Sequence, residues 1–331
     1  MRVISQYIAN NNNAGPKAKV DIEKILNDNY GAEIFTYKID PSSKKGILTK
    51  IRKFLFSYNA FHTKDLVLVQ LPYTNKLYII KKAKNKIAII HDIDGLRYQN
   101  NDLLKQEIKA LNNYKCVIVH NKSMKAFLNA NGLKVKTVEL DLFDYLINSK
   151  IEFNKSILKK DNPKIAYPGN LEPKKASFIY NLDEKKMNFE LHVYGSGFNK
   201  TDNKKISYMG SFEPSILPTK FQSDLGLVWA GEMDESDENL IEKNYNKYNT
   251  PHKLSCFIAA GLPVIIWEKA AAADIVLKYN IGYTIKNIYD INNLNFDNYE
   301  EVKRNVEILS EKVRNGEFIK KAFIEAKKIT L

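Results

Sequence analysis

The chain has 331 residues, of which 44% are hydrophobic, and 51 basic residues outnumber 38 acidic ones for a formal charge of +13. This length exceeds the size at which one hydrophobic core stops growing, so we expect two folded domains, and the composition excludes a largely disordered chain. No short-period repeat is present, which excludes solenoids and propellers. The positive charge suits nucleic acid, an anionic membrane or phosphorylated small molecules, and does not choose among them.

The cysteines and the N-terminal residues predict a cytoplasmic location. Cys116 and Cys256 lie in apolar stretches, with no CxxC pair and no histidine cluster, so we expect reduced core residues. No basic segment followed by an apolar run opens the chain, and no window approaches about 18 uninterrupted apolar residues. We therefore expect a cytoplasmic protein, at most peripheral to the inner face of the plasma membrane.

The first half of the chain alternates apolar strands with helical patterns. Residues 18–31 predict a helix that ends at Gly31. Its apolar residues are expected on one face: Val20, Ile22, Ile25 and Leu26. Apolar runs predict strands at residues 2–8, 65–71, 86–92 and 115–121. Strands that are apolar throughout and alternate with helices are typical of a parallel sheet with both faces covered.

Residues 43–61 predict a basic amphipathic helix. One face carries apolar side chains: Ile47, Leu48, Ile51, Phe54, Leu55 and Tyr58. Beside them stand five basic residues: Lys44, Lys45, Lys50, Arg52 and Lys53. Such a helix can lie on an anionic membrane, although most helices with this pattern pack on their own sheet and leave the basic face in solvent.

The same alternation restarts after residue 160. Further apolar runs occur at residues 164–170, 189–197, 205–211, 225–231, 262–268 and 281–287. The polar stretch 155–163 suits an exposed linker. We predict two Rossmann-like, doubly wound α/β domains, at residues 1–160 and 161–310. A charged helical pattern over 299–329 follows, and its last part, 311–331, is expected to pack back on the first domain. Its apolar face is Val302, Val306, Leu309, Val313 and Phe323.

Polar residues follow the apolar runs of the first domain, at the edge where open parallel sheets bind ligands. His91, Asp92 and Asp94 end one run, and His120 ends the next. Asp92 or Asp94 could act as a general base, or hold His91 in one tautomer. Helix capping and an ion pair with Arg97 explain either aspartate equally well.

Glycines take the corresponding positions in the second domain, at 169, 195, 197 and 210. They permit close approach of the backbone to a ligand, and the helix N-termini that follow would offer N–H groups to a diphosphate. Any one of these glycines is also what an ordinary strand-to-helix turn contains.

A second candidate anion-binding element starts at Pro251. This residue precedes a helix whose first turn holds His252 and Lys253, so side-chain and backbone donors stand together. The helix dipole opposes a lysine at this position, which favours a negatively charged ligand over a merely solvated side chain. No HExxH or acidic DxD motif ends a strand, so we expect no metal and no other cofactor. No RNA- or DNA-binding module is present, so we expect no nucleic acid partner.

These positions also carry a family resemblance. The segments are Ala14–Lys19, His91–Asp94, Leu96–Arg97, His120–Asn121, Phe143–Leu146, Gly169–Leu171, Ser177–Tyr180, Leu225–Trp229, Pro251–Lys253 and Leu262–Ala270. In order and spacing the chain resembles the bacterial β-1,6-galactofuranosyltransferases, which are two-domain enzymes of the GT-B type. It is also similar to the glucosyltransferases that extend N-acetylglucosamine on serine-rich repeat adhesins, which share the PGN, GLVW and AAGxPVI elements.

The resemblance implies a GT-B fold, with the two domains facing across a cleft, and a UDP-sugar donor on the second domain. The donor residues it implies are Gly169, Asn170, Lys174, Lys175, Gly195, Gly197, Tyr208, His252 and Lys253. Lys253 and Tyr208 match the lysine and tyrosine that hold uridine diphosphate in the family. Lys174 or Lys175 matches its basic residue after the PGN turn, in a loop that is longer here.

For the first domain the resemblance implies an acceptor site. Its residues are Asn13, Gly15, Lys17, His91 and Arg97. Asp92, or alternatively Asp94, is expected to remove the proton of the attacking hydroxyl. The implied reaction transfers a hexose, galactofuranose first of all, from a UDP-sugar to a growing surface glycan with inversion. The acceptor is a lipid-linked glycan or a glycoprotein.

Two other functions remain open. The first is a transferase that uses UDP-glucose or UDP-GlcNAc to extend N-acetylglucosamine on a serine-rich repeat glycoprotein. The second is a noncatalytic, sugar-nucleotide-binding partner of another transferase, which would keep the site and show no turnover. The sequence leaves the donor sugar, the acceptor, a homo-oligomer and a peripheral membrane contact open.

Overall fold

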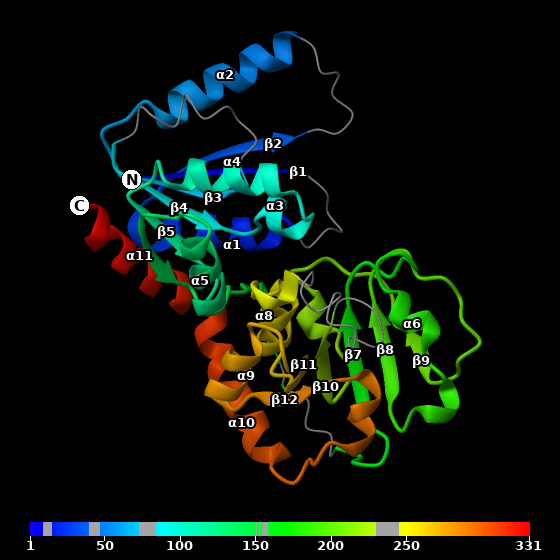
Figure 1. Cartoon of the computed structure of the whole chain (residues 1–331). Coiled ribbons are helices and arrows are strands. Elements are labelled where there is room, and N and C mark those ends of the chain that lie inside the picture. The colour runs from blue at the N-terminus through cyan, green and yellow to red at the C-terminus, as the bar shows by residue number, and fades with distance from the viewer. Residues whose placement is uncertain are drawn as a thin grey trace. The chain divides into compact units, whose positions relative to one another are not determined.

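The structure is a computed structural model that describes residues 1–8, 15–39, 47–72, 84–149, 151, 153, 158–229 and 245–331. The chain divides into two compact units (Figure 1). The first comprises Met1–Asp144 with Gly316–Leu331, and the second Tyr145–Asn315. In the described ranges each unit contains one parallel sheet of six strands, flanked by helices.

The first unit alternates strands and helices along the chain. Its elements are β1 (Arg2–Ile8), α1 (Lys17–Tyr30), β2 (Glu33–Ile39), α2 (Ile47–Phe61), β3 (Val67–Leu71), β4 (Lys86–Ile90), α3 (Asp94–Arg97), α4 (Asn101–Leu111), β5 (Cys116–Val119), α5 (Lys122–Ala130), β6 (Lys136–Glu139) and α11 (Glu317–Thr330). The strand order is β2-β1-β3-β4-β5-β6, so the order in which successive strands are added changes side between β1 and β3. Doubly wound sheets bind ligands at such a switch point.

Helices cover both faces of this sheet, as the apolar strands predicted. On one face, alternate residues of the strands pack against α2, α4 and α5, with Phe61, Leu104, Ile108 and Leu128 in one core cluster. On the other, α11 contacts β4, β5 and β6, and α1 contacts β1 and β2. Burying a leucine or isoleucine side chain in such a core stabilises the fold by about 1.5–3 kcal/mol.

Helix α1 matches its predicted extent and differs on its predicted face. Gly31 ends the helix in the left-handed region, with φ of 60°. Ile22, Ile25 and Leu26 are buried as expected, whereas Val20 is 39% exposed. The apolar face is therefore narrower than the four residues predicted.

The second unit has the strand order of dinucleotide-binding folds. Its elements are β7 (Lys164–Pro168), α6 (Ser177–Asn181), β8 (Glu190–Tyr194), β9 (Ile206–Tyr208), β10 (Leu225–Val228), α8 (His252–Ala259), β11 (Val264–Trp267), α9 (Ala273–Tyr279), β12 (Gly282–Ile285) and α10 (Tyr299–Arg314), with 3₁₀ turns at Glu184–Lys186, Leu217–Thr219, Tyr245–Lys247 and Ile288–Asn293. The order β12-β11-β10-β7-β8-β9 places the switch point between β7 and β10. Both halves are therefore doubly wound, as predicted.

The C-terminal helical pattern is two helices rather than one. α10 ends at Arg314 and α11 begins at Glu317, and Gly316 between them has φ of +73°. A Cβ at Gly316 would lie 2.8 Å from the side chain of Ile25, so the break also allows close packing on α1. The chain passes from the first unit to the second between residues 144 and 145, and returns to the first between residues 315 and 316. From the sequence, the corresponding boundaries were expected at residues 160 and 310.

Asp144 holds the start of α11 against the first unit. Its carboxyl accepts hydrogen bonds from the backbone N–H groups of Phe318 (3.2 Å) and Ile319 (2.7 Å). The residue is 2% exposed, and burial raises its pKa to about 7. A residue far away in sequence thus caps this helix N-terminus.

Two further expectations concern cysteines and membrane segments. Cys116 and Cys256 are buried free thiols, as predicted. Across the described ranges, no helix combines the length and apolar character needed to cross a bilayer.

Candidate functional site

The carboxyl end of β4 carries the predicted polar cluster of the first unit. Asp92 accepts a hydrogen bond from Nη1 of Arg97 at 2.9 Å, and both side chains are partly exposed. Asp94 begins α3, and the backbone N–H groups of Asp94 and Gly95 donate to the carboxylate of Glu107 at 3.0 and 2.8 Å. The expected ion pair with Arg97 therefore exists for Asp92, whereas the carboxylate that accepts from the first N–H groups of α3 is that of Glu107 and not of an aspartate.

His91 is connected to the switch point by a buried glutamine. Its Nε2 lies 2.8 Å from Oε1 of Gln70, at the end of β3. The amide nitrogen of Gln70 donates to Oγ of Ser5 in β1 (2.6 Å) and to the backbone oxygen of Lys19 in α1 (3.0 Å). The side chain of Gln70 therefore joins β1, α1, β3 and the end of β4 at the switch point of the sheet.

The start of α1 contributes two lysines to this region. Lys17, a predicted acceptor residue, forms an ion pair with Asp21, and both side chains are largely buried. Lys19 donates from Nζ to the backbone oxygens of Gln6 (2.8 Å) and Pro72 (3.1 Å), so it joins the ends of β1 and β3. Burial lowers the pKa of Lys19 to about 8, against the opposing effect of nearby carboxylates, Asp92 first. Gly15 is exposed just before the helix, and Asn13 lies outside the described residues.

Phe143 packs between the two histidines of the cluster. The ring of His91 stacks on Phe143 with centroids 5.2 Å apart, and His120 meets the same ring edge-on at 4.9 Å. Nε2 of His120 lies 3.1 Å from the backbone oxygen of Ile90. Burial lowers the pKa of His120 to about 4, so this ring is neutral at pH 7.

The glycine turns of the second unit lie side by side. Gly169 N donates to the backbone oxygen of Tyr194, and Leu171 N donates to that of Ser196. A Cβ at Gly195, where φ is +141°, would lie 1.8 Å from the backbone oxygen of Gly169. Around Gly169 itself the nearest atom to such a Cβ is 3.9 Å away, so this turn has room beside it.

Tyr208, Gly197 and Asn170 belong to the same group of turns. The Tyr208 hydroxyl donates to the backbone oxygen of Gly195 at 3.0 Å, and its half-exposed ring stacks on Phe198 at 5.0 Å. A Cβ at Gly197 would lie 2.6 Å from the side chain of Glu172. The backbone N–H of Glu172 donates to Oδ1 of Asn170. The predicted donor residues after β7, β8 and β9 therefore come together.

Lys253 lies at the switch point of the second sheet. Its Nζ donates to the backbone oxygen of Trp229, just after β10, at 2.9 Å. The same atom lies 4.1 Å from the centre of the Tyr167 ring, whose edge borders Gly169. Burial lowers the pKa of Lys253 to about 7. An incoming anion would raise this pKa again, because a nearby negative charge favours the ammonium form.

The remaining predicted donor residues occupy different surroundings. His252 stacks on Tyr145 at 4.8 Å, and the Tyr145 hydroxyl donates to the backbone oxygen of Pro214 at 2.6 Å. Lys174 and Lys175 are exposed in the turn after Gly169. All the residue roles drawn from the sequence, in both units, stay predictions.

Sequence reasoning missed Gln70, Lys19 and Tyr167 as parts of these clusters. Gln70 had a signal, since it is a polar residue inside the apolar run 65–71. Lys19 ends the segment Ala14–Lys19 that carries the family resemblance, but no role was predicted for its side chain, because a lysine in a charged helix is ordinarily solvated. Tyr167 sits in an apolar strand, and its contact with Lys253 depends on long-range packing.

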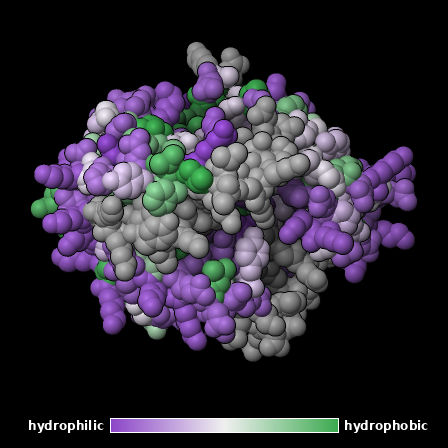
Figure 2. Space-filling model, turned by 90° about the horizontal axis from the view of Figure 1, so that it is seen from above, coloured by the Kyte–Doolittle hydropathy of each residue, from purple (hydrophilic) through white to green (hydrophobic). Residues whose placement is uncertain are grey.

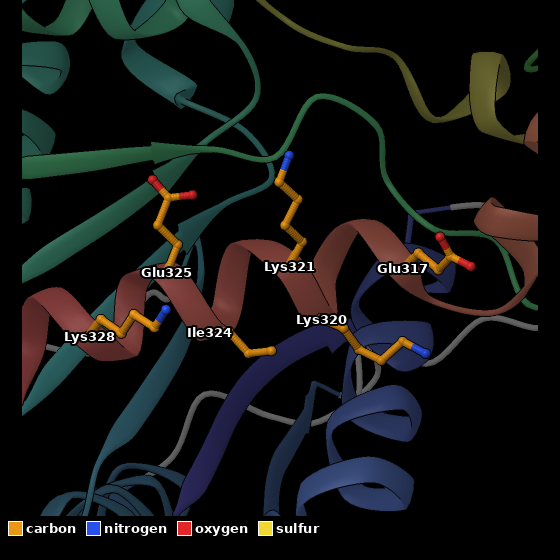
Figure 3. A pocket seen from close by; sticks show the side chains of 6 residues that line it. All are labelled: Glu317, Lys320, Lys321, Ile324, Glu325 and Lys328. Carbon is orange, nitrogen blue, oxygen red and sulfur yellow. The ribbon is translucent and has the colours of Figure 1, made fainter.

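The described ranges contain no group of three or more His, Cys, Asp or Glu side chains that could hold a metal ion. A hollow of about 520 Å³ runs along α11, lined by Glu317, Lys320, Lys321, Ile324, Glu325 and Lys328. In Figure 3 Lys320 and Lys321 point in different directions. Three lysines and two glutamates line the hollow, so it does not gather one charge. None of these residues was predicted to bind a ligand.

Family models match almost the whole chain. The N-terminal domain of the glucosyltransferase 3-like family matches residues 1–142, and its C-terminal domain matches residues 165–326. The two models lie on the two sheets in the expected order.

Two curated relatives are similar over most of their length. The β-1,6-galactofuranosyltransferase WbbI of Escherichia coli (strain K12) is 28% identical over 317 residues, covering 93% of this chain and 92% of WbbI. Glucosyltransferase 3 of Streptococcus parasanguinis is 28% identical over 276 residues, covering 79% of this chain and 78% of that protein.

Solved structures share the fold at low sequence identity. The lipopolysaccharide outer core galactosyltransferase WaaB superposes with a TM-score of 0.62, at 14% identity, over 100% of both chains. Anabaena Alr3699/HepE in complex with UDP-glucose superposes with a TM-score of 0.57, at 12% identity, over 99% of this chain and 98% of that one. The sequence matches and the paired doubly wound sheets agree: the chain belongs to the glucosyltransferase 3-like family and is a glycosyltransferase of GT-B fold.

Proposed function

We propose that the protein transfers a hexose from a UDP-sugar, galactofuranose from UDP-galactofuranose first of all, to a sugar hydroxyl of a growing surface glycan. The observation that carries this proposal is Lys253, a partly buried lysine with a depressed pKa at the switch point of the second sheet. The galactofuranose donor is supported by the relative named for that sugar, which spans nearly the whole chain. UDP is supported by the HepE complex.

In the proposed reaction the second unit holds the donor. Backbone N–H groups near Gly169, Gly195 and Gly197 approach the diphosphate, and Lys253 neutralises it. Tyr208, Asn170, His252 and one of Lys174 and Lys175 complete the proposed site. A preorganised cation at the point where charge develops on the leaving group is worth several kcal/mol in comparable sites.

The first unit activates the acceptor in this proposal. The acceptor hydroxyl oxygen forms a bond to the anomeric carbon, and the bond from that carbon to the diphosphate breaks, leaving its electron pair on UDP. The hydroxyl proton passes to a carboxylate, Asp92 or Asp94. Asp92 already forms an ion pair with Arg97, and Asp94 is the alternative base. Attack opposite the leaving group inverts the anomeric configuration.

A panel of UDP-sugars tests the proposal. The purified full chain is incubated with UDP-galactofuranose made in situ, UDP-glucose, UDP-galactose and UDP-GlcNAc, with sugar acceptors, and mass spectrometry detects UDP and the glycosylated product. Release of UDP that depends on acceptor supports the proposal, and the preferred sugar names the donor. No release with any donor, in a protein that UDP still stabilises against heat, would instead identify the noncatalytic partner.

A glucosyltransferase is the second candidate. Both domain models and a relative that covers 79% of this chain are named for glucosyltransferase 3. They support UDP-glucose or UDP-GlcNAc as donor and N-acetylglucosamine on a serine-rich repeat glycoprotein as acceptor. The panel separates the candidates directly, because only a glucosyltransferase would add glucose to an N-acetylglucosaminyl peptide.

A lipid-linked acceptor would suit a peripheral membrane contact through α2. This helix exposes Ile51, Phe54, Leu55 and Tyr58, by 42–58%, together with Arg52. Figure 2 looks down on this side and shows hydrophobic side chains among hydrophilic ones. Flotation with anionic but not neutral vesicles, lost in Leu55→Glu, would support the contact. A concentration-dependent dimer lost in the same variant would assign the face to a homo-oligomer instead.

A further inference from the structure

Gln70 is a fully buried polar side chain in an otherwise apolar strand. Burying an amide costs free energy unless its hydrogen bonds are made, and this amide makes three. Its nitrogen donates to Ser5 Oγ and to the Lys19 backbone oxygen, and its oxygen lies 2.8 Å from Nε2 of His91.

The partners of Gln70 determine where the proton of His91 lies. A backbone oxygen only accepts hydrogen bonds, so the Gln70 atom 3.0 Å from the Lys19 oxygen must be the nitrogen. Oε1 therefore faces His91. Because Oε1 also only accepts, Nε2 of His91 must carry the hydrogen, and in the neutral ring Nδ1 carries the lone pair.

The surroundings keep this arrangement in place. Phe143 stacks on the His91 ring with an interplanar angle of 23°, and the backbone N–H of His91 donates to Leu71 at 3.0 Å. His120, edge-on to Phe143, is neutral at pH 7 and adds no charge. The charged groups of this cluster are Asp92, Asp94 and Arg97 on the segment of His91, Lys19 on α1 and Glu107 on α4.

We propose that Gln70 is a positioning residue that holds His91 in the Nε2–H tautomer, so that Nδ1 accepts a hydrogen bond from a hydroxyl of the acceptor sugar. The inference rests on the proposed function and on the expectation, implied by the family resemblance, that His91 binds the acceptor. It adds the atom that does so, the direction of the hydrogen bond, and the residue that sets both. An acceptor lacking that hydroxyl is then discriminated against, because Nδ1 loses its donor.

The tautomer is measured without any turnover. The full chain is labelled with ¹⁵N-histidine, and the ring of His91, one of five histidines, is assigned by its loss from the spectrum of His91→Asn. A protonated Nε2 and an unprotonated Nδ1 at about pH 8 support the inference. An Nδ1–H tautomer overturns it, whatever the enzyme transfers.

Variants of Gln70 test the positioning role. In Gln70→Leu the tautomers mix, and kcat/KM for the acceptor falls about tenfold while KM for the donor stays, as expected for one lost neutral hydrogen bond. Gln70→Glu loses the donor to the Lys19 oxygen but still accepts from Nε2, so it keeps the Nε2–H tautomer and shifts the pH profile upward, because a carboxylate stabilises the imidazolium. A merely structural role would lower thermal stability without moving the tautomer or the profile.

Failure of the proposed function gives a different result. If no UDP-sugar is turned over but His91 has the Nε2–H tautomer and loses it in Gln70→Leu, the proposed function fails and the positioning role stands. If the donor is turned over and Gln70→Leu leaves the tautomer of His91 unchanged, the positioning role fails. Should Gln70→Leu not fold, the tautomer of the unaltered protein and of Gln70→Glu decides.

Discussion

The two units share an architecture and organise their candidate sites by different means. In the first, a buried side chain, Gln70, links the ends of β1, β3 and β4 with the start of α1. In the second unit the backbone itself forms the site. Gly195 lies so close to Gly169 that a Cβ at Gly195 would collide with the Gly169 backbone oxygen. One lysine, Lys253, then supplies the charge.

The difference matches the ligands proposed for each side. A sugar acceptor is neutral and offers hydroxyl groups, so it is recognised by donors and acceptors whose hydrogens are fixed beforehand. A diphosphate is an anion with many equivalent oxygens, which backbone N–H groups and one cation satisfy. The first site therefore depends on proton positions and the second on close approach and charge.

Replacing Gly195 is the most severe way to break the second site. Gly195→Ala should lower the free energy of unfolding by about 3 kcal/mol or more, because φ is +141° and the new Cβ would lie 1.8 Å from the Gly169 oxygen. Both tryptophans of the chain, Trp229 and Trp267, lie in the second unit. Denaturation followed by tryptophan fluorescence therefore reports this unit alone.

Gly169→Ala is the matched control. It has no atom nearer than 3.9 Å to its Cβ, so it should unfold like the unaltered protein and still bind UDP more weakly if the diphosphate approaches this turn. Equal stability of Gly195→Ala and Gly169→Ala would show that the two turns are not held as closely as described.

Removing the cation should cost activity rather than stability. We expect Lys253→Met to lower kcat/KM for the UDP-sugar on the order of 100-fold, as for loss of one charged donor to a leaving group. Lys220→Met is the control, since this exposed lysine also lies over an aromatic ring, Phe212, at 5.9 Å. Turnover of Lys253→Met within a few fold of the control would remove Lys253 from the donor site.

Much of the fold was readable because its signals are local. The runs at 2–8, 86–92 and 164–170 became β1, β4 and β7, since strands buried on both faces must be apolar throughout. The break between α10 and α11 was missed, although Asn315 and Gly316 form a pair that is typical of turns. The contact that accompanies it was not readable, because Ile25, which leaves no room for a Cβ at Gly316, is distant in sequence.

The candidate site was predictable at strand ends and invisible between them. His91, Gly195 and Lys253 follow apolar runs or begin a helix, which are positions that sequence can mark. The contacts of Gln70 with Lys19, and of Lys253 with Tyr167, join different elements, so only the assembled sheet reveals them. Asp144 belonged to a recognised motif, but its partners on α11 lie more than 170 residues away.

The hydrogen bonds from the start of α11 to Asp144 allow the stability of the first unit to be perturbed separately from that of the second. Asp144→Ala should destabilise α11 by about 1–2 kcal/mol, because two backbone N–H groups lose their acceptor. Hydrogen exchange at Phe318 and Ile319 should speed up while tryptophan fluorescence of the second unit stays unchanged. Asp290→Ala uncaps the 3₁₀ turn at residues 288–293 in the second unit. In this variant tryptophan fluorescence should report a less stable second unit, while hydrogen exchange at Phe318 and Ile319 stays unchanged.

This effect should depend on pH with a definite sign. The pKa of Asp144 is raised from 3.8 to about 7 in the fold, so its contribution is fully present below 3.8 and is lost as the pH rises through about 7. The stability difference between the unaltered protein and Asp144→Ala should therefore narrow toward higher pH. Asp144→Asn cannot ionise, so the stability difference between Asp144→Asn and Asp144→Ala should not change with pH. A difference between the unaltered protein and Asp144→Ala that widens toward higher pH would contradict the raised pKa of Asp144.

The pH dependence of UDP binding separates the contribution of charge from that of close backbone approach. Burial lowers the pKa of Lys253 from 10.5 to about 7, so the unliganded unit gains stability as the pH rises from about 7 toward 10.5 and loses it as the pH falls. UDP needs the ammonium form, so its affinity should fall over the same range, by at most about tenfold per pH unit for one proton. Calorimetry in buffers of different ionisation enthalpy should record proton uptake on binding above pH 7.

The opposite signs make the test strict. Tryptophan-detected stability without UDP should rise with pH while UDP affinity falls, and Lys253→Met should flatten both slopes together. The turns at Gly169 and Gly195 hold no titratable group, so a site made by close approach alone would bind UDP equally well across this range. Affinity that is independent of pH, with binding intact in Lys253→Met, would assign the diphosphate to the backbone and leave the lysine a structural contact of Trp229 and Tyr167.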